Sequence, residues 1–356
     1  MSLPTRRDVM RLAAASAAGV AFAQEPRTIG YCIVGIGRIA GHYLAGMRLS
    51  QYSRVTALVS GHRDKAEKTA AQYNVPAQSI YSYEDYDAIA ENKAIDAVIV
   101  CLPNSMHAEY TIRAARAGKH ALCEKPMCAT VADAEAMIAA CRQAGRKLMV
   151  GYRCQYEPMH LRAVQLIREG RLGLVHTIES VNGFNIRAGE WRLSRKLAGG
   201  GPLMDVGIYS LNASRTLTGE EPAECKGEMS TINRDGRFDE VEEHLAWTMK
   251  FPSGVLASCQ TSYGVGMPGW YRVRGSKGTL EMSSAFGYQG QHLTAHINGE
   301  PAIDETSPLR DPGHFPLETD HLAECIFQDK EPKTPGEEGL RDMRLMMDIY
   351  KSCGRV

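Results

Sequence analysis

Residues 29–40 read Ile-Gly-Tyr-Cys-Ile-Val-Gly-Ile-Gly-Arg-Ile-Ala. The first six form a short, mostly apolar run that is typical of a buried strand, and the pattern G-x-G-x-x-A follows at the start of a helix-like stretch. The first glycine permits a tight turn, the second lets a pyrophosphate approach the backbone, and the small third residue lets the helix pack on the sheet. The free N–H groups of the first helical turn favour a phosphate. The motif predicts a dinucleotide site with contacts at Gly35, Gly37, Arg38 and Ile39.

Strand-like and helix-like segments alternate from about residue 28 to residue 150. Strands are expected at 29–34, 55–59, 97–102, 121–123 and 147–150, and helices at 35–50, 64–73, 107–117 and 131–144. This alternation requires right-handed crossovers and therefore predicts a parallel sheet. After residue 155 a helix at 161–169 leads into consecutive strands at 176–182, 242–251, 254–263, 270–275 and 278–282, which predict a mostly antiparallel sheet. Helices at 317–328 and 337–352 end the chain.

The predicted fold class is therefore α/β with two domains. We expect a Rossmann dinucleotide-binding domain at residues 24–152 and an α+β domain at residues 153–356. The second domain, for substrate binding and dimerisation, would contain a largely antiparallel open sheet, and its final helix can pack back on the Rossmann domain.

Composition narrows the function further. The 356 residues include 41 Lys and Arg against 41 Asp and Glu, so the formal net charge is zero. This balance excludes a generally basic nucleic-acid binder and a polyacidic disordered chain. No apolar run approaches the ~20 residues of a membrane span. A globular protein that handles a small molecule is expected.

The N-terminus has the pattern of an export signal. Residues 1–23 contain Thr5-Arg6-Arg7-Asp8-Val9-Met10-Arg11, which resembles a twin-arginine motif, then an Ala-rich apolar stretch and an A-x-A cleavage site. We expect recognition by the twin-arginine export machinery and a periplasmic location. The ten cysteines form no C-x-x-C pair and no His/Cys cluster with zinc spacing, so free structural thiols and no metal are expected.

The end of the second predicted strand indicates which nucleotide is bound. An acidic residue there would bind the ribose 2′-hydroxyl of NAD, whereas a 2′-phosphate requires positive charge and hydroxyl donors. The chain has Ser60-Gly61-His62-Arg63-Asp64-Lys65, so no carboxylate closes the strand. NADP is therefore favoured, with Ser60, Gly61, Arg63 and Lys65 as contacts.

Three further polar segments should meet at the carboxyl edge of the sheet, where such folds bind ligands. They are Leu102-Pro103-Asn104-Ser105-Met106-His107, Cys123-Glu124-Lys125-Pro126, and residues 199–209, which contain Asp205 and Tyr209. Asp205 and Tyr209 are four residues apart and would share one face of a helix. Lys125 could lower the pKa of Tyr209, and Tyr209 could take a hydroxyl proton as hydride leaves the carbon.

Together these motifs resemble the glucose–fructose oxidoreductase / inositol dehydrogenase family, and within it the glucose–fructose and aldose–aldose oxidoreductases. The matching residues are 35–40, 58–61, 102–105, 107–109, 117–120, 123–127, 151–154, 156, 158, 191–193, 205–212, 218–222 and 335–339. The resemblance implies a tightly held NADP, oxidation of an aldose at C1 to a lactone, and transfer of the hydride to a second sugar, which leaves as an alditol. A homodimer or homotetramer is implied as well.

The resemblance also implies roles for individual residues. Lys125, Asp205 and Tyr209 match the catalytic positions, and with Arg153 and Tyr156 they would contact the sugar. The cofactor contacts would extend to Leu102, Pro103, Asn104, His107, Glu124, Lys125, Arg153, Trp191 and Arg192.

Three alternatives remain open. The first is an ordinary sugar or polyol dehydrogenase that exchanges NADP at each turnover. The second is an NAD-dependent glycosidase of the same broad family, for which a His-containing motif would be expected in place of Asp205-Val206-Gly207-Ile208-Tyr209. The third is a non-catalytic sensor, against which the presence of Lys125, Asp205 and Tyr209 argues.

Overall fold

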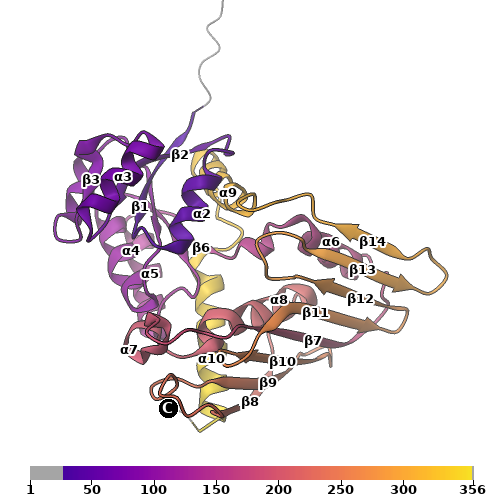
Figure 1. Ribbon diagram of the computed structural model, residues 1–356. Coiled ribbons are helices and arrows are strands. Elements are labelled where there is room, and N and C mark those ends of the chain that lie inside the picture. Colours follow the sequence, from indigo (N-terminus) through magenta and orange to yellow (C-terminus); the bar gives the residue numbers. More distant parts are fainter. Residues whose placement is uncertain (1–26, 355–356) are drawn as a thin grey trace, which may run out of the picture.

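Six parallel strands form the sheet of the N-terminal half in the computed structural model, which describes residues 27–354 (Figure 1). The predicted export signal at residues 1–23 lies outside the described residues. The strands are β1 (Ile29–Val34), β2 (Ser53–Val59), β3 (Ile80–Tyr81), β4 (Ala97–Val100), β5 (His120–Glu124) and β6 (Leu148–Gly151). Their order, β3-β2-β1-β4-β5-β6, is that of a Rossmann fold. The predicted parallel sheet is confirmed.

The crossover helices begin and end close to the residues predicted for them. They are α2 (Arg38–Gly46), α3 (Arg63–Tyr73), α4 (His107–Arg116) and α5 (Val131–Gln143). The Thr130 hydroxyl accepts a hydrogen bond from the Asp133 N–H and so caps α5. β1 and β4 are buried along their whole length, which explains why both are apolar throughout.

The C-terminal half contains an eight-stranded sheet whose order is β14-β13-β12-β11-β7-β10-β9-β8. Its strands are β7 (Val175–Gly183), β8 (Glu224–Ser230), β9 (His244–Lys250), β10 (Leu256–Ser262), β11 (Met267–Gly275), β12 (Gly278–Ser283), β13 (His292–Ile297) and β14 (Ile303–Thr306). All neighbours are antiparallel except β7 and β10, which are parallel. The predicted, mostly antiparallel sheet is confirmed, although the prediction missed β8, β13 and β14.

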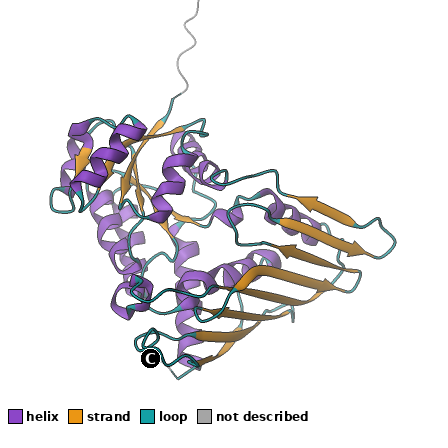
Figure 2. Cartoon of the chain, viewed as in Figure 1, coloured by secondary structure: helices purple, strands orange, loops and turns teal. Residues whose placement is uncertain are grey.

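Helices lie over one face of this sheet (Figure 2). They are α6 (Pro158–Arg168) and α8 (Ile208–Thr218), with the short α7 (Arg195–Ala198) nearer the N-terminal half. In β9 the side chains of Leu245, Trp247 and Met249 are buried and alternate with more exposed neighbours, which is the pattern of a sheet packed on one side. None of the described helices covers the opposite face of the sheet (Figure 2).

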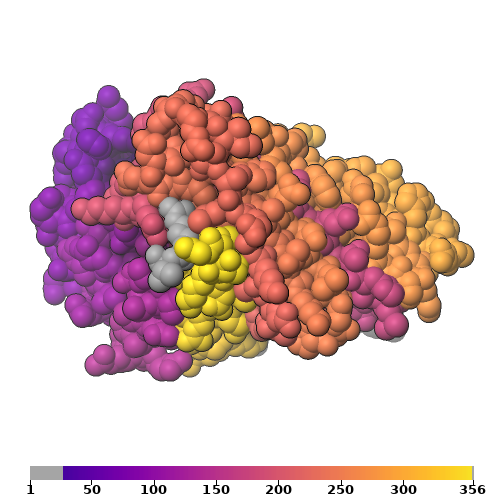
Figure 3. Space-filling view, turned by 90° about the horizontal axis from the view of Figure 1, so that it is seen from below, coloured from indigo at the N-terminus to yellow at the C-terminus, as the bar shows by residue number. Residues whose placement is uncertain are grey.

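The last two helices return to the N-terminal half. The Tyr31 hydroxyl donates to the Thr319 carbonyl of α9 (His314–Gln328) over 2.8 Å, and the Asp320 carboxylate accepts from the Ser53 hydroxyl, also over 2.8 Å. α10 (Gly336–Ser352) packs on both α5 and β8 and lies between the two halves (Figure 3). Segments from the end of the chain thus complete the packing of its beginning.

Within residues 27–354, no helix is long and apolar enough to cross a membrane. The same residues contain no group of three His, Cys, Asp or Glu side chains arranged to hold a metal ion. All ten cysteines are free thiols in this part of the chain, and six of them are buried in the two main cores.

Candidate active site

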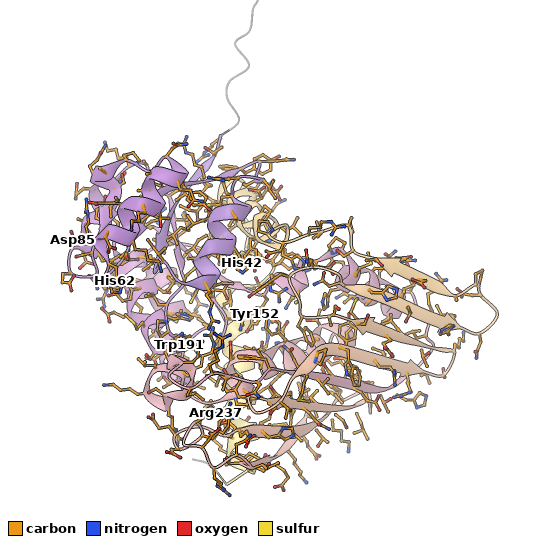
Figure 4. The ribbon with its side chains drawn as sticks, viewed as in Figure 1. His42, His62, Asp85, Tyr152, Trp191 and Arg237 are labelled. Atoms are coloured by element: carbon orange, nitrogen blue, oxygen red, sulfur yellow. The ribbon has the colours of Figure 1, made fainter. Side chains whose placement is uncertain are left out.

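A cavity of about 630 Å³ lies where the carboxyl ends of β1, β2, β4 and β5 face the C-terminal half. In Figure 4, His42 on α2 and Trp191 lie along the boundary between the two halves, and His62 lies on the Rossmann side. Eighteen of the predicted site residues line this cavity. They are Gly35, Gly37, Arg38, Ile39, Ser60, Gly61, Lys65, Leu102, Pro103, Asn104, His107, Glu124, Lys125, Arg153, Trp191, Arg192, Asp205 and Tyr209.

The glycine-rich turn has the shape that a dinucleotide requires. Gly35 has φ +88°, and a Cβ there would lie 2.6 Å from Leu102 Cδ2, so only glycine fits. A Cβ on Gly37 would meet no atom of the described chain within 4 Å. The space beside Gly37, at the N-terminus of α2, is therefore open for a diphosphate, and the residues present fit the cofactor.

The turn after β2 differs in one respect from the prediction. Ser60 and Lys65 line the cavity as expected, but Arg63 does not. The Arg63 Nε donates to Glu67 over 2.8 Å, and its Nη1 donates to the Ile80 carbonyl over 3.2 Å, so these bonds hold the guanidinium away from the site. His62, which the prediction passed over, lines the cavity instead.

Lys125 and Asp205 join the two halves of the chain inside the cavity. Lys125 follows β5, and its Nζ donates to the Asp205 carbonyl over 2.6 Å and to Asp205 Oδ1 over 3.2 Å. Asp205 Oδ2 accepts from Arg192 Nε and from the Tyr263 hydroxyl, each over 2.9 Å. Burial opposes ionisation of Asp205, but Lys125 and then Arg192 outweigh it and hold the pKa of this carboxyl well below its usual range.

The sequence predicted that Asp205 and Tyr209 lie on one regular α-helix. The structure differs from this prediction. Residues Leu203–Gly207 form a π-helical turn, which runs into α8 and carries Asp205, while Tyr209 lies in the first turn of α8. Gly207 permits this path because a Cβ there would be 3.0 Å from the Thr261 side chain. Both side chains nevertheless face the same cavity, and the Asp205 carbonyl accepts the Lys125 ammonium. Such π-turns occur frequently at functional sites.

The Tyr209 ring is held between an aromatic ring and two cations. It stacks on Phe286 with ring centroids 5.5 Å apart, while Lys125 Nζ and Arg153 Cζ lie 4.7 and 5.1 Å from its centroid. Burial raises the pKa of Tyr209, and Arg153 lowers it only in part. The pKa of Tyr209 is therefore raised overall because burial dominates, whereas the sequence led us to expect a lowered pKa.

Arg153 acts mainly as a buried support. Its Nη1 donates to the Gly287 carbonyl over 2.7 Å and its Nη2 to the Phe286 carbonyl over 2.5 Å, while its guanidinium lies 4.5 Å from the centre of the Tyr288 ring. These contacts fix residues 286–288 at the edge of the cavity. Nη1 also lies 3.3 Å from His314 Nδ1, and Nε is buried without a hydrogen-bond partner among the described residues.

Several predicted contacts have other partners. Tyr156 does not line the cavity: its hydroxyl bonds to the Thr334 hydroxyl over 2.9 Å, and its ring packs beside His321 of α9. The side chains of Asn104 and His107 line the cavity but already bond to carbonyls of the chain. The structure thus places Tyr156 outside the predicted sugar site, because the turn after Arg153 directs it toward α9.

Sequence reasoning missed part of the lining. The missed residues are Ile36, His42, His62, Tyr83, Cys101, Asn182, Phe184, Val206, Phe286, Gly287 and Tyr288. Five of them come from α2, β7 or the loop between β12 and β13, where no motif marks a site. Ile36, His62, Cys101 and Val206 adjoin residues that had been singled out.

Glu190 links the segment before α7 to the nucleotide turn. Its Oε2 accepts from Arg38 Nη2 over 2.9 Å and lies 3.6 Å from Arg192 Nη1. Arg192 in turn contacts Asp205. A series of opposite charges therefore runs along the cavity from the start of α2 to Lys125.

Comparison with known families gives two matches along the chain. An oxidoreductase family with an NAD-binding Rossmann fold matches residues 29–152, and the GFO/IDH/MocA C-terminal domain matches residues 160–281.

Individual relatives extend over most of the chain. The crystal structure of aldose-aldose oxidoreductase from Caulobacter crescentus, complexed with glycerol, is 45% identical with a TM-score of 0.89, and the match covers 92% of this chain and 98% of that one. D-xylose 1-dehydrogenase [NADP(+)] from Haloarcula marismortui is 33% identical over 303 residues, which are 83% of each chain. A 1,5-anhydro-D-fructose reductase from Ensifer adhaerens is 27% identical over 328 residues, or 90% of this chain and 95% of the relative.

Proposed function

Because this chain belongs to the GFO/IDH/MocA family of oxidoreductases, we propose that it is an NADP-containing aldose oxidoreductase. It would oxidise one sugar at C1 to a lactone and reduce a second sugar, ketose or aldose, to an alditol. The C1–H bond breaks with its electron pair, and the hydroxyl proton leaves as the C=O bond forms. Hydride and proton then add to the carbonyl of the second sugar, so atoms and electrons balance over the two steps.

One observation carries this proposal: Lys125, Asp205 and Tyr209 meet in the same cavity as the open glycine turn. The cofactor, when bound there, would accept and return the hydride. The residues opposite it supply the ammonium, carboxylate and phenol groups that a sugar hydroxyl requires. The names of the relatives, which include aldose-aldose oxidoreductase and xylose dehydrogenase, support a sugar as substrate.

The three residues have different roles in this proposal. Asp205 remains an anion and anchors Lys125, because three donors occupy its oxygens. Lys125 directs its remaining N–H toward the sugar oxygen and favours its negative charge during the reaction. Tyr209 stays protonated at neutral pH and donates its hydroxyl hydrogen bond to the same oxygen.

NADP in preference to NAD is supported by the turn after β2. Ser60 and Lys65 line the cavity there together with His62, and no carboxylate closes the strand. A dianionic 2′-phosphate suits such a set of donors. Retention of the nucleotide between the two steps is supported by the Arg38–Glu190 contact beside the glycine turn.

Location and assembly are also part of the proposal. The twin-arginine pattern at residues 5–11 supports export of the folded, cofactor-containing protein to the periplasm, where a retained nucleotide would be an advantage. The open face of the eight-stranded sheet supports pairing of two copies, as a homodimer or within a homotetramer.

The decisive experiment uses purified protein with no added nucleotide. Glucose is added while absorbance in the NADPH band is recorded, and fructose follows. We expect a stoichiometric rise that the second sugar reverses. A trace that stays flat until NADP is supplied would replace the proposal with a dehydrogenase that exchanges its cofactor. No response with NADP to a panel of aldoses, combined with release of nitrophenol from a nitrophenyl glycoside, would favour the glycosidase alternative.

A further inference from the structure

Two buried carboxyl groups meet at one tyrosine behind the cavity. The Tyr43 hydroxyl on α2 lies 2.9 Å from Glu124 Oε1 and 3.2 Å from Glu318 Oε2. Tyr43 and Glu318 have no exposed surface, and Glu124 is 8% exposed where it lines the cavity. Neither Tyr43 nor Glu318 has a part in the reaction described above.

The number of protons in this cluster follows from its geometry. A tyrosine hydroxyl has one proton to donate, yet two carboxyl oxygens lie within hydrogen-bonding distance of Tyr43. Two buried carboxylates this close would repel each other. If one carboxyl is protonated, it donates to the Tyr43 oxygen, Tyr43 donates to the other carboxylate, and both contacts become hydrogen bonds.

The surroundings show which carboxyl carries this proton. Glu318 Oε1 has no hydrogen-bond partner within the described chain, and the nearby cation Arg153 offsets the burial of this carboxyl only in part. Glu124 is better suited to charge, because its Oε2 accepts from the Lys125 backbone N–H over 3.2 Å and Lys125 is its neighbour. The resting arrangement is therefore a protonated Glu318, a bridging Tyr43 and an ionised Glu124.

Glu124 is also the one carboxylate in the cavity with capacity for a proton. Among the described residues that line the cavity, only Glu124 and Asp205 are acidic. Asp205 is held as an anion by Lys125 and Arg192, whereas burial raises the pKa of Glu124. A proton set free in the cavity would therefore go to Glu124 rather than to Asp205.

We propose that Glu124 stores the hydroxyl proton of the first sugar and returns it to the second, with Tyr43 and Glu318 as positioning residues. In the first step the O–H bond of the sugar breaks and its proton goes to the Glu124 carboxylate while the hydride leaves C1. In the second step the same proton adds to the oxygen of the new hydroxyl group. The catalytic part of this inference rests on the proposed function.

The groups that surround Glu318 and Glu124 favour a proton on Glu318. Glu318 is approached by Tyr43 from α2, by Glu124 from β5 and by Arg153 and Cys154 from the turn after β6. Tyr156 and Cys101 also lie near it. Burial and the neighbouring Glu124 raise the pKa of Glu318, and Arg153 opposes them only in part. Glu318 therefore keeps its own proton, and Glu124 is the ionised member of the pair.

The test counts protons instead of activity alone. The full-length protein is stripped of nucleotide, and NADP⁺ or NADPH is added in weakly buffered solution with an indicator dye. Since the oxidised ring carries one more positive charge, an ionised Glu124 is favoured beside it and a protonated Glu124 beside the reduced ring. Near neutral pH the wild-type NADPH complex should hold close to a full proton more than the NADP⁺ complex.

Glu124→Gln and Glu228→Gln form a matched pair of variants. The Glu124→Gln amide keeps the shape of the side chain but cannot take up the proton, so the difference in proton content between the two complexes should disappear. Glu228→Gln, on the exposed edge strand β8, should behave as wild type. Equal proton content of the two wild-type complexes would overturn the inference, whatever sugars react.

A second measurement counts the protons that the wild-type protein releases during turnover. It requires no variant. When glucose reduces the bound nucleotide, wild-type protein should release well under one proton to solvent for each NADPH formed. Release of a full proton per NADPH would contradict storage at Glu124. Another result is that glucose forms no NADPH while the NADP⁺ and NADPH complexes still differ in proton content. That result would reject the proposed sugars but would support proton storage at Glu124.

Discussion

The Lys125 ammonium is fixed twice by Asp205, through its backbone oxygen at 2.6 Å and through Oδ1 at 3.2 Å. The two residues belong to different halves of the molecule. Their contact therefore aligns the nucleotide-binding half with the half that presents Tyr209. Orientation of the ammonium is independent of any bound ligand, which is what a preorganised site requires.

Replacing Lys125 should separate binding from chemistry. Lys125→Met removes the ammonium but keeps the apolar stem, so hydride transfer should slow by ~10²-fold or more. Nucleotide affinity should change only a few-fold, because the glycine turn is untouched. Single-turnover absorbance and a binding titration measure the two effects, with the exposed Lys351→Met as control. Near-normal hydride transfer would remove Lys125 from the catalytic set.

Tyr209→Phe should lower the rate without altering its pH dependence. The ring still stacks on Phe286, so the fold should be kept, while loss of the hydroxyl should slow hydride transfer by ~10²-fold. Burial raises the pKa of Tyr209, so its hydroxyl stays protonated from roughly pH 6 to 9. The residual rate should keep the wild-type profile over that range. If the wild-type rate changes with pH in that range and the rate of Tyr209→Phe does not, Tyr209 ionises in that range.

Asp205→Asn should destabilise the fold at neutral pH. Removing one partner of a buried ion pair costs about 3 kcal/mol or more, and urea unfolding at pH 7 would measure it. The folded-state pKa of Asp205 is lowered, so its stabilisation is present above the unfolded value of 3.8 and is lost as pH falls through the folded pKa. The difference in unfolding free energy between wild type and Asp205→Asn should become smaller below about pH 4. A difference that does not change with pH would contradict this account.

The two glycines of the nucleotide turn should respond differently to alanine. Gly37→Ala places a methyl group in open space, so stability should change by less than about 0.5 kcal/mol while nucleotide affinity falls at least ~10-fold. Gly35→Ala forces a positive φ and a clash with Leu102, which should cost about 2 kcal/mol or more of stability. Thermal unfolding and nucleotide titration of both variants test this. An unchanged affinity in Gly37→Ala would place the diphosphate elsewhere.

Glu190→Gln should speed nucleotide release. The Arg38–Glu190 pair is exposed on the arginine side, so its loss should raise the release rate roughly 2- to 5-fold at low salt. Added salt should narrow the difference because exposed charges are screened. Stopped-flow displacement measures the rate, and Glu228→Gln on the exposed edge strand β8 serves as control. Equal nucleotide release rates in the two variants would show that Glu190 does not slow release.

The central site could be predicted because each part has a local signature. Gly35 and Gly37 are identified by their spacing after a strand, and Lys125, Asp205 and Tyr209 by polar segments at element ends together with the family resemblance. Parallel strands bring such ends to one edge, so the prediction did not need tertiary detail.

What could not be predicted depends on tertiary packing. β8 carries charged residues at alternate positions and β14 contains the adjacent Asp304 and Glu305, as edge strands often do, so neither presents an apolar run. Phe286 and Tyr288 come from a loop without a motif and take their place because Arg153 binds that loop's carbonyls. Arg63 and Tyr156 were assigned by position in a motif, but neighbours distant in sequence decided which way each side chain points.

The return of α9 to the N-terminal half has a consequence for synthesis. Phe315 and Leu322 of α9 belong to the same buried cluster as Tyr31 and Tyr43. A ribosome that has completed residue 152 has therefore not yet made part of that core, and the remaining segment up to Gln328 takes on the order of 10 to 35 s to synthesise. During that interval the first half presents an unfinished apolar face, and a chaperone that covers it would bind the nascent chain rather than the released protein.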